Sequence, residues 1–450
     1  MTSPDFEQLK HQVLATLQHA KEAWRTQVPQ RLLEALQACD QMLTSLPDEP
    51  VVGENKIPDP QEPLAKERGS LWLWRGRLLV AADKPEVVVQ GLHSLDQAIA
   101  RFGLLSDRFD VREELIVAWM NRGSGLFRLA SKDALAEAVR SYDQAIELLK
   151  DAPDATRVSL GAAWMNRGTA LMHLDEDNEP RESRDARLAD AAMSFEKAIE
   201  ILDPLASSQR PAKHNLASAW ANLGMLRARR GEAEAAVVAH RQAVELFRPL
   251  AAEGGPREKF ELAARIFNLG QACGIAGQTA AALEAGREAL ALASEIATED
   301  ANAGELSLRA RHAVCVTLGG MLSVGSKDAP ERGAQLEEAS DLVEEGLAAL
   351  ATRGATASPG EKTAGVRLYE FGAWLYRTQQ PQFLGEFLLD HVGDDPQRAQ
   401  IAAAAVKTAR QAFVQRSFND TTQGGMDRVL AIVQDLGAVE VRLKALNITG

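Results

Sequence analysis

Cysteine, aromatic residues and long apolar runs are all scarce in this sequence. Its three cysteines, Cys39, Cys273 and Cys315, lie far apart, which argues against a disulfide framework and favours buried, reduced thiols. No uncharged apolar stretch reaches the ~18 residues that a membrane-spanning helix needs. The first residues are polar and charged and lack the apolar core of a signal peptide, so we expect a cytoplasmic protein that no membrane holds.

Positive charge is also in short supply. Lysine and arginine number 50 against 63 aspartates and glutamates, which gives a formal net charge of −13 at pH 7. Binding to nucleic acid or to an anionic membrane depends on neutralising phosphates, so this balance argues against both as general partners. The chain is 46% hydrophobic, which is enough to bury a sizeable core and excludes wholesale disorder.

Motifs for catalysis and for cofactor binding are missing. None of the eight histidines forms the HExxH or HxH spacing of a zinc site. The segment SPGEKTAG (358–365) lacks the Gly-Lys-Ser/Thr of a phosphate loop, and neither GxSxG nor GxGxxG occurs. The sequence therefore predicts no enzyme, no metal site and no cofactor.

Strand patterns are nearly absent, whereas one short motif recurs at intervals of 45 to 56 residues. Each copy ends in glycine, and several begin with tryptophan. The copies are WLWRG (72–76), WMNRG (119–123), WMNRG (164–168), WANLG (220–224), IFNLG (266–270), CVTLG (315–319) and a weaker LYEFG (368–372). Recurrence of one motif at a similar interval is typical of a repeat architecture.

A second motif follows each of the first five copies, with apolar residues three or four positions apart as in a helix. These segments are SLDQAIARF (94–102), SYDQAIELL (141–149), SFEKAIEIL (194–202), AHRQAVELF (239–247) and EAGREALAL (284–292). The glycine of the first motif and the alanine of the second let two backbones approach closely. One pair cannot bury both of its faces, so we predict stacked antiparallel helix pairs with a continuous core.

These motifs together resemble the tetratricopeptide repeat. The resemblance covers roughly residues 70–380, as six to seven repeats, and implies an all-α, right-handed α-solenoid, a superhelix of antiparallel helix pairs. The period is about 45 residues against 34 in the family, as in extended repeats similar to those of kinesin light chains. We expect longer helices or longer connections between repeats to account for the difference.

The flanking segments differ from the repeats. Residues 1–46 read as an N-terminal helix pair, and 47–69 as an extended, proline-rich linker. Residues 175–187 are densely charged, and we expect them to form a solvated loop. Residues 381–450 are predicted to be C-terminal helices that cap the apolar end of the stack.

The resemblance implies that the first helix of each pair lines a binding groove. Two positions before the glycine stand Asn121, Asn166, Asn222, Asn268 and Thr317, and five positions after it stand Arg128, His173, Arg229, Ile275 and Val324. An asparagine amide both donates and accepts, so this series could clamp a peptide backbone; the alternative is that it bonds within its own array. The basic residues predict a preference for an acidic or carboxylate-bearing segment, against the alternative of ordinary solvated arginines.

Charges also vary together between the repeats. Arginine precedes the glycine in three repeats whose second motif carries an acid, and both charges are absent from the next two. We therefore predict the structural ion pairs Arg75–Asp96, Arg122–Asp143 and Arg167–Glu196 between paired helices, because a partly buried arginine needs a partner.

Three functions fit these observations unequally. The favoured one is a non-catalytic scaffold that binds a peptide or a partner protein in its groove, with self-association left open. The alternative is a ligand- or peptide-responsive regulator that controls a partner through superhelix conformation. An enzyme on a helical scaffold is the third, and it would need a cluster of titratable groups that the sequence does not show.

Overall fold

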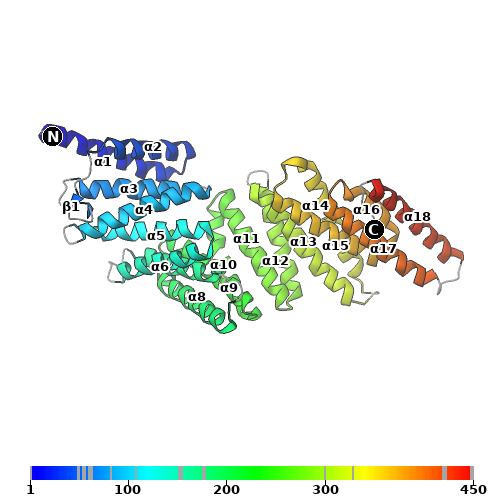
Figure 1. Ribbon diagram of the computed structural model, residues 1–450. Coiled ribbons are helices and arrows are strands. Elements are labelled where there is room, and N and C mark those ends of the chain that lie inside the picture. Colours follow the sequence, from blue (N-terminus) through cyan, green and yellow to red (C-terminus); the bar gives the residue numbers. More distant parts are fainter. Residues whose placement is uncertain are drawn as a thin grey trace. The chain divides into compact units, whose positions relative to one another are not determined.

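The computed structural model (Figure 1) describes residues 3–47, 51–52, 57–58, 64–81, 84–106, 109–150, 156–174, 179–297, 301–326, 329–417 and 423–445. Within them the chain forms helices joined by short connections and one pair of two-residue strands. It divides into two compact units, Met1–Leu226 and Arg227–Gly450. None of the described helices combines the length and the apolar character needed to cross a membrane.

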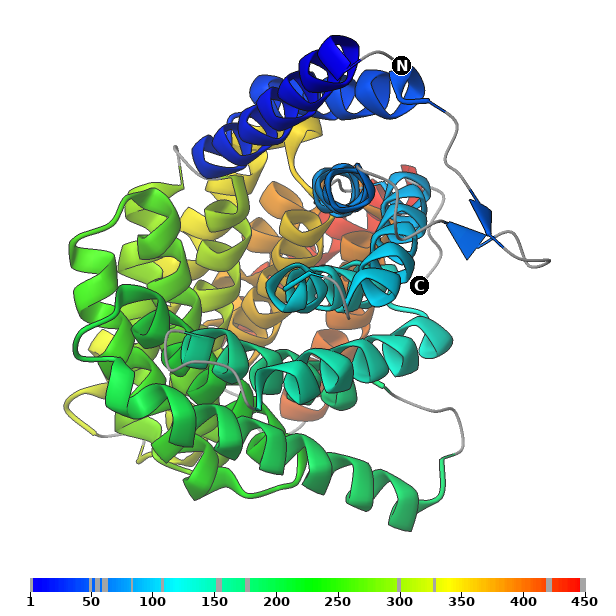
Figure 2. The ribbon, with the colours of Figure 1, turned by 90° about the vertical axis from the view of Figure 1, so that its left-hand side faces the viewer.

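The first unit begins with a helix pair and a small strand pair, which precede three complete repeats. Its elements are α1 (Ser3–Thr26), α2 (Pro29–Ser45), β1 (Val51–Val52), β2 (Ile57–Pro58), α3 (Ala65–Val80), α4 (Pro85–Leu105), α5 (Arg112–Leu129), α6 (Lys132–Leu149), α7 (Arg157–His173), α8 (Arg181–Leu202), the 3₁₀ turn η2 (Asp203–Leu205) and most of α9 (Arg210–Arg229). Helices α1 and α2 lie side by side and both contact α3, and the strand pair lies apart from them (Figure 2).

The second unit continues the helix pairs to the end of the described chain. Its elements are α10 (Ala233–Ala252), α11 (Pro256–Ile275), α12 (Thr279–Ile296), α13 (Ala301–Val324), α14 (Arg332–Arg353), η3 (Gly354–Thr356), α15 (Pro359–Gln379), η4 (Pro381–Phe383), α16 (Leu384–Val392), α17 (Pro396–Ser417) and α18 (Gln423–Ala445). Buried residues from α13 to α18 share one hydrophobic core. The predicted C-terminal helices thus contribute to the same core as the last repeats.

The structure places the repeat motifs as the sequence predicts. Every copy of the first motif lies in an odd-numbered helix from α3 to α15, and every copy of the second lies in an even-numbered helix from α4 to α12. Helices pack within a pair, as α3 does on α4, and between pairs, as α4 does on α5. The all-α array of antiparallel helix pairs is confirmed. Its repeat helices have 16 to 24 residues, so long helices account for the long period.

The repeat glycines allow a bulky side chain of the paired helix to reach the backbone. A Cβ atom on Gly123 would lie 2.6 Å from the ring of Tyr142, and one on Gly168 would lie 2.8 Å from the ring of Phe195. The alanines of the second motif, Ala98, Ala145, Ala198, Ala243 and Ala289, are all fully buried. Close approach of the two helices is therefore built into both motifs.

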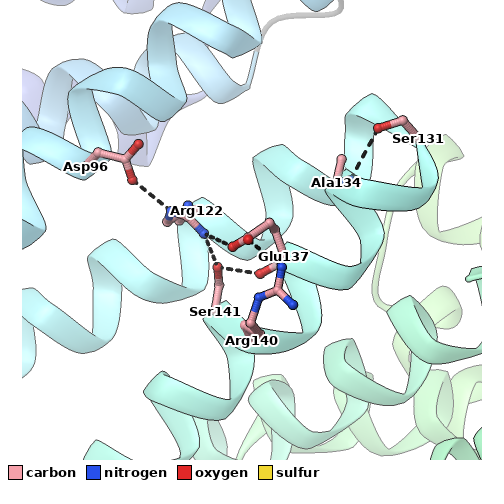
Figure 3. A network of polar contacts seen from close by, with 7 residues as sticks. All are labelled: Asp96, Arg122, Ser131, Ala134, Glu137, Arg140 and Ser141. Carbon is pink, nitrogen blue, oxygen red and sulfur yellow. Dashed lines mark hydrogen bonds and ion pairs between the residues drawn. The ribbon is translucent and has the colours of Figure 1, made fainter.

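One arginine side chain joins three helices in each of the first three repeats. Arg122 of α5 donates from Nε to Asp96 of α4 at 2.8 Å and from Nη1 to Ser141 of α6 at 2.8 Å (Figure 3). Its Nη1 also lies 3.4 Å from Glu137 of α6. The equivalent contacts are Arg167 Nε to Asp143 (2.7 Å) and Nη1 to Ser194 (2.8 Å), and Arg75 Nε to Asp40 (2.5 Å) and Nη1 to Ser94 (2.6 Å).

The predicted ion pairs are therefore wrong by one helix pair. The structure has Arg75–Asp40, Arg122–Asp96 and Arg167–Asp143 in place of Arg75–Asp96, Arg122–Asp143 and Arg167–Glu196. Each second helix packs between two first helices, and its acid reaches the arginine of the following repeat. Within the repeat, each arginine donates to a buried serine, and Arg122 and Arg167 also contact a carboxylate, Glu137 and Asp190 respectively.

The predicted linker is shorter than expected. Helix α3 begins at Ala65, inside the stretch 47–69, and strands β1 and β2 pair within the same stretch. Arg68 of the first turn of α3 is buried and donates from Nη2 to the carbonyl oxygen of Pro47 at 3.0 Å. This contact holds the start of the linker against the helix.

Part of the predicted charged loop is helical. Residues 181–187 form the first turns of α8, whereas 175–178 lie outside the described residues. The Arg187 guanidinium pairs with Glu179 at 2.7 Å and donates to the carbonyl oxygen of Leu171 at 2.7 Å. Opposite charges at helical spacing stabilise a helix, so a run of mixed charge need not be a loop.

Candidate functional site

The asparagine series lies on first helices, as predicted, and two of its amides bond within the array. The Nδ2 of Asn121 donates to the carbonyl oxygen of Val117 at 2.7 Å. The Nδ2 of Asn222, on α9, donates to Oγ1 of Thr169 on α7 at 2.9 Å. All four asparagines, including Asn166 and Asn268, are half-buried. Bonds of this kind agree with the structural alternative, and peptide binding by the series stays a prediction.

The basic residues of the predicted groove lie in the last turns of their helices. Arg128 is the last residue but one of α5, His173 ends α7 and Arg229 ends α9, and all three are exposed. His173 meets the ring of Phe127 edge to face, with ring centroids 5.5 Å apart. A cationic side chain at a helix C-terminus complements the helix dipole, which gives these residues a structural reason for their position.

A continuous groove occurs in the second unit, along α13. Three adjoining cavities of about 520, 740 and 220 Å³ share lining residues, and we call them together the α13 groove. Helices α11, α13 and α15 line the first cavity with α12; α11 to α14 line the second; α13 and α15 line the third. Gly274, Val316 and Thr317 belong to the first two cavities, and Gly320 belongs to the second and third. The first helices of three consecutive pairs therefore meet at one surface.

The walls of the α13 groove are apolar, and part of its floor is bare backbone. Ile275, Val316 and Val324 are 66%, 51% and 90% exposed. A Cβ atom on Gly320 would meet nothing within 4 Å, and one on Gly274 would meet only Ala282, at 4.0 Å. An exposed apolar surface lined with glycine leaves room for the backbone of a bound chain.

One end of the α13 groove is basic. Arg309 and His312 of α13 and Arg367 of α15 line the 520 Å³ cavity. The Arg309 guanidinium lies 5.1 Å from the centroid of the Phe267 ring, in a cation–π contact. Burial and the nearby Arg367 guanidinium lower the pKa of His312, and Glu370 opposes that shift.

The other end of the groove combines an aromatic pair with polar side chains, among them Glu331 and Gln335. Phe371 and Trp374 line the 220 Å³ cavity, with ring centroids 5.3 Å apart. Arg332 lines the 740 Å³ cavity but is occupied: it donates to the carbonyl oxygen of Leu322 at 2.8 Å and to Gln379 at 2.6 Å. The lining of the groove therefore changes along α13, from cationic near Arg309 to a mixture of apolar and polar side chains beyond Gly320.

The repeat register located part of this groove, although the residue types did not point to it. Thr317, Ile275 and Val324 occupy the two predicted groove positions of the later repeats, and all three line the cavities. Asn268 is not among the residues that line the first cavity from α11. The basic end was missed, because Arg309 and Arg367 stand ten and five residues before their repeat glycines, at different register positions.

Groups that could hold a metal do not occur in the described part of the chain. No cluster of three or more histidine, cysteine, aspartate or glutamate side chains is placed to coordinate an ion there. Cys39, Cys273 and Cys315 are free thiols and buried, as predicted. Burial raises the pKa of the Cys39 and Cys315 thiols to about 12, which leaves both protonated and unreactive.

Comparison with known proteins finds likeness only among solved structures. No protein-family model matches the sequence, and no curated protein matches it. The apo form of RapI matches at 9% identity and a TM-score of 0.47, over 96% of this chain and 98% of that one. The apo form of the quorum sensor NprR from B. thuringiensis matches at 12% identity and 0.47, over 98% and 99%. A Rap protein complexed with competence and sporulation factor matches at 14% and 0.40, over 97% and 99%.

The fold is tetratricopeptide-like. The recurring motifs, the helix pairs and the glycine–aromatic contacts of this chain carry that conclusion. At such identities and TM-scores, the residues of the matched proteins have no assigned counterparts here. The particular similarity to kinesin light chains stays a prediction.

Proposed function

We propose that this chain is a non-catalytic binding protein that holds a peptide, or an extended segment of a partner protein, in the α13 groove. The observation that carries the proposal is the run of adjoining cavities along three first helices. Arg309 and Val324 stand fifteen residues apart on α13, which is about 22 Å at the helical rise. An extended chain covers that length with about six or seven residues.

The groove has the surface that peptide recognition requires. Its apolar side chains bury ligand surface, and its open glycine floor lets a ligand backbone come close to the helix. The asparagine series of the first unit is a second candidate surface, but the amides of Asn121 and Asn222 already bond within the array. The absence of catalytic motifs in the sequence supports a binding role, and the three free thiols support a reducing, cytoplasmic setting.

The test fills the groove without disturbing the fold. Gly320→Trp places a large side chain where the backbone has open space, so the helix stays intact and the groove is blocked. Gly103→Trp on α4 is the matched control, because Gly103 is also exposed and also has no atom within 4 Å of its Cβ position. Wild-type protein and both variants are immobilised and exposed to a random heptapeptide pool, and helix content is checked by circular dichroism.

We expect the wild type and Gly103→Trp to retain the same family of peptides. Gly320→Trp should retain at least tenfold less. If the wild type enriches no sequence, or if Gly320→Trp enriches the same ones equally, the α13 groove is not the binding site. In the second case Asn166→Ala/Asn222→Ala would show whether the asparagine series binds instead.

A regulatory role is the second candidate, and the division of the chain favours it. Two compact units joined within α9 provide parts that a ligand in one of them could reorient. A donor dye in the first unit and an acceptor in the second would report this as a change in energy transfer when a selected peptide binds. Unchanged transfer at saturating peptide would leave the chain a passive scaffold.

A further inference from the structure

Building on the proposed function, we infer that the α13 groove selects ligands that carry a carboxylate, and that Arg309 and Arg367 hold it. The two guanidinium groups come from different helices, α13 and α15, and line one cavity of about 520 Å³. A carboxylate between two such groups would accept charge-assisted hydrogen bonds from both.

The spacing of the lining residues directs both arginines toward the cavity. On α13 the cavity is lined at Arg309, His312, Val316 and Thr317, at intervals of three or four residues that mark one helix face. On α15 it is lined at Ala364 and Arg367, which are three residues apart. Both faces line the same cavity, which places the two guanidinium groups within reach of one bound ligand.

Arg309 and Arg367 have weaker ion pairs within the protein than a neighbouring arginine of the second unit has. Arg311, two residues from Arg309, pairs with Glu345 at 2.8 Å. Arg309 has only a long contact of 3.8 Å to Glu305, and both side chains are exposed. Arg367 forms no ion pair with any residue that the structure describes. In a chain of net charge −13, two exposed arginines that line one cavity and have no close carboxylate partner among the described residues form a site for an external anion.

The walls of the cavity strengthen the attraction between the arginines and a carboxylate, and the lining beyond them determines which other side chains the ligand should carry. Phe267 and Val316 form apolar walls beside the arginines. Apolar walls lower the local dielectric, which makes an ionic hydrogen bond stronger than it is in open water. Burial is the main cause of the lowered pKa of His312, and the nearby Arg367 guanidinium lowers it further. Beyond Gly320 the groove offers the apolar side chains of Val324, Phe371 and Trp374 beside the polar Glu331 and Gln335, so the preferred ligand joins a carboxylate to mainly apolar side chains.

The carboxylate could come from an acidic side chain or from a free C-terminus, and three synthetic heptapeptide pools separate these sources. The first has free C-termini and no aspartate or glutamate. The second has amidated C-termini and includes aspartate and glutamate. The third is amidated and contains neither. Each pool is passed over the immobilised full chain, and retained peptide is measured by mass spectrometry.

We expect the first or the second pool to be retained at least tenfold better than the third, and the preferred pool names the source. Equal retention of all three by the wild type, lost in Gly320→Trp, would overturn the carboxylate inference and leave the proposed function intact. If no pool is retained, or if Gly320→Trp changes nothing, the groove itself fails as a binding site and the inference fails with it.

Arginine variants test the two residues directly. Arg309→Gln/Arg367→Gln should lower retention of the preferred pool by about tenfold to a hundredfold, the range expected for lost hydrogen bonds to a charged group. Arg311→Gln is the matched control, since Arg311 lies on the same helix and is absent from the cavity lining, and it should bind like the wild type. Undiminished binding by the double variant would overturn the assignment.

Reversal of the charge excludes simple misfolding. Arg309→Glu/Arg367→Glu should lose the carboxylate-bearing pool and gain an amidated pool that contains lysine. An unfolded variant could lose binding but could not acquire the opposite preference. Loss without that gain, in a variant of normal helix content, would count against a direct role for the two guanidinium groups.

Discussion

A single arginine per repeat connects the first three repeats to the helix pair before each of them. Arg167 donates to Asp143 of the preceding pair and to Ser194 and Asp190 of its own pair. Ser194 is fully buried, and only 14% of the arginine side chain is exposed. Removing the guanidinium would leave a buried hydroxyl and two carboxylates with one donor fewer, a larger loss than that of an exposed ion pair.

Double-mutant cycles distinguish the observed pairs from the predicted ones. The pair Arg167→Leu and Asp143→Ala should show a coupling energy of about 0.5–1 kcal/mol, because nearly half of the Asp143 side chain is exposed and solvent screens the pair. The pair Arg122→Leu and Asp143→Ala should be additive. Urea unfolding of the single and double variants measures both cycles. Coupling in the second cycle but not in the first would restore the predicted pairing.

The sequence could indicate which charges vary together, but not which neighbour each one meets. In a stack, every second helix has one first helix before it and another after it, and one repeat separates the two choices. The pattern at Asp96 and Asp143 fits both, since the same residue types recur on each side. The direction in which the carboxylate points from α4 or α6 determines which first helix it contacts. That direction depends on how each helix is rotated about its axis in the stack.

His240 links stability to pH. It is 3% exposed on α10, its Nδ1 has no hydrogen-bond partner among the described residues, and burial lowers its pKa to about 4. The His240 imidazole takes up a proton near pH 6.5 in the unfolded chain but only near pH 4 in the folded chain. As the pH falls from 6.5 toward 4, the free energy of unfolding therefore decreases by about 1.4 kcal/mol per pH unit. Between pH 7.5 and 5, His240→Leu should lose about 2 kcal/mol less than the wild type in urea unfolding. Parallel pH profiles would contradict this.

At the level of helices, glycine serves two different purposes in the first motif and its surroundings. Gly123 lets α6 approach α5, because the ring of Tyr142 occupies the space where a Cβ would stand. Gly320, one residue after a repeat glycine, faces open space in the α13 groove instead. The first kind stabilises the helix pair, whereas the second costs helix stability and keeps the groove floor open.

Alanine substitutions should therefore act in opposite directions. Gly123→Ala should lower the free energy of unfolding by about 1–3 kcal/mol, as overpacking does. Gly320→Ala should raise it by up to about 1 kcal/mol, since alanine is the better helix former and meets no neighbour. Urea midpoints of the two variants give the comparison. Equal destabilisation by both would mean that Gly320 is packed in solution.

Helices were predictable from the sequence because their evidence is repeated, whereas the groove was not. Seven copies of one motif average out local ambiguity, so the odd-numbered helices from α3 to α15 appear where the motif places them. The α13 groove depends on the residues that depart from the repeat. Arg309 and Arg367 belong to no recurring position, and their convergence results from the packing of α13 on α15. A feature that occurs once in the chain and depends on packing can be located only in the three-dimensional structure.

At the scale of the whole chain, a repeat array is held together by contacts between neighbours. Among the described residues, the contacts that join different helix pairs are mainly between neighbouring pairs, so the stability of one part depends weakly on a distant part. The division into Met1–Leu226 and Arg227–Gly450 follows from the same property. Damage in one unit should therefore be felt mainly within that unit.

Hydrogen exchange can test this with one substitution in each unit. In the first unit, Gly123→Ala pushes α5 away from α6. In the second unit, Gly372→Ala pushes α15 away from α16, because Phe387 of α16 fills the space beside the glycine. Each variant should speed amide exchange in its own unit by the factor that its lost stability implies, about tenfold for each 1.4 kcal/mol, and should leave the other unit close to wild type. If either substitution raises exchange equally in α5 and in α15, the chain unfolds as one cooperative body. A ligand in the α13 groove would then stabilise the first unit as fully as the second.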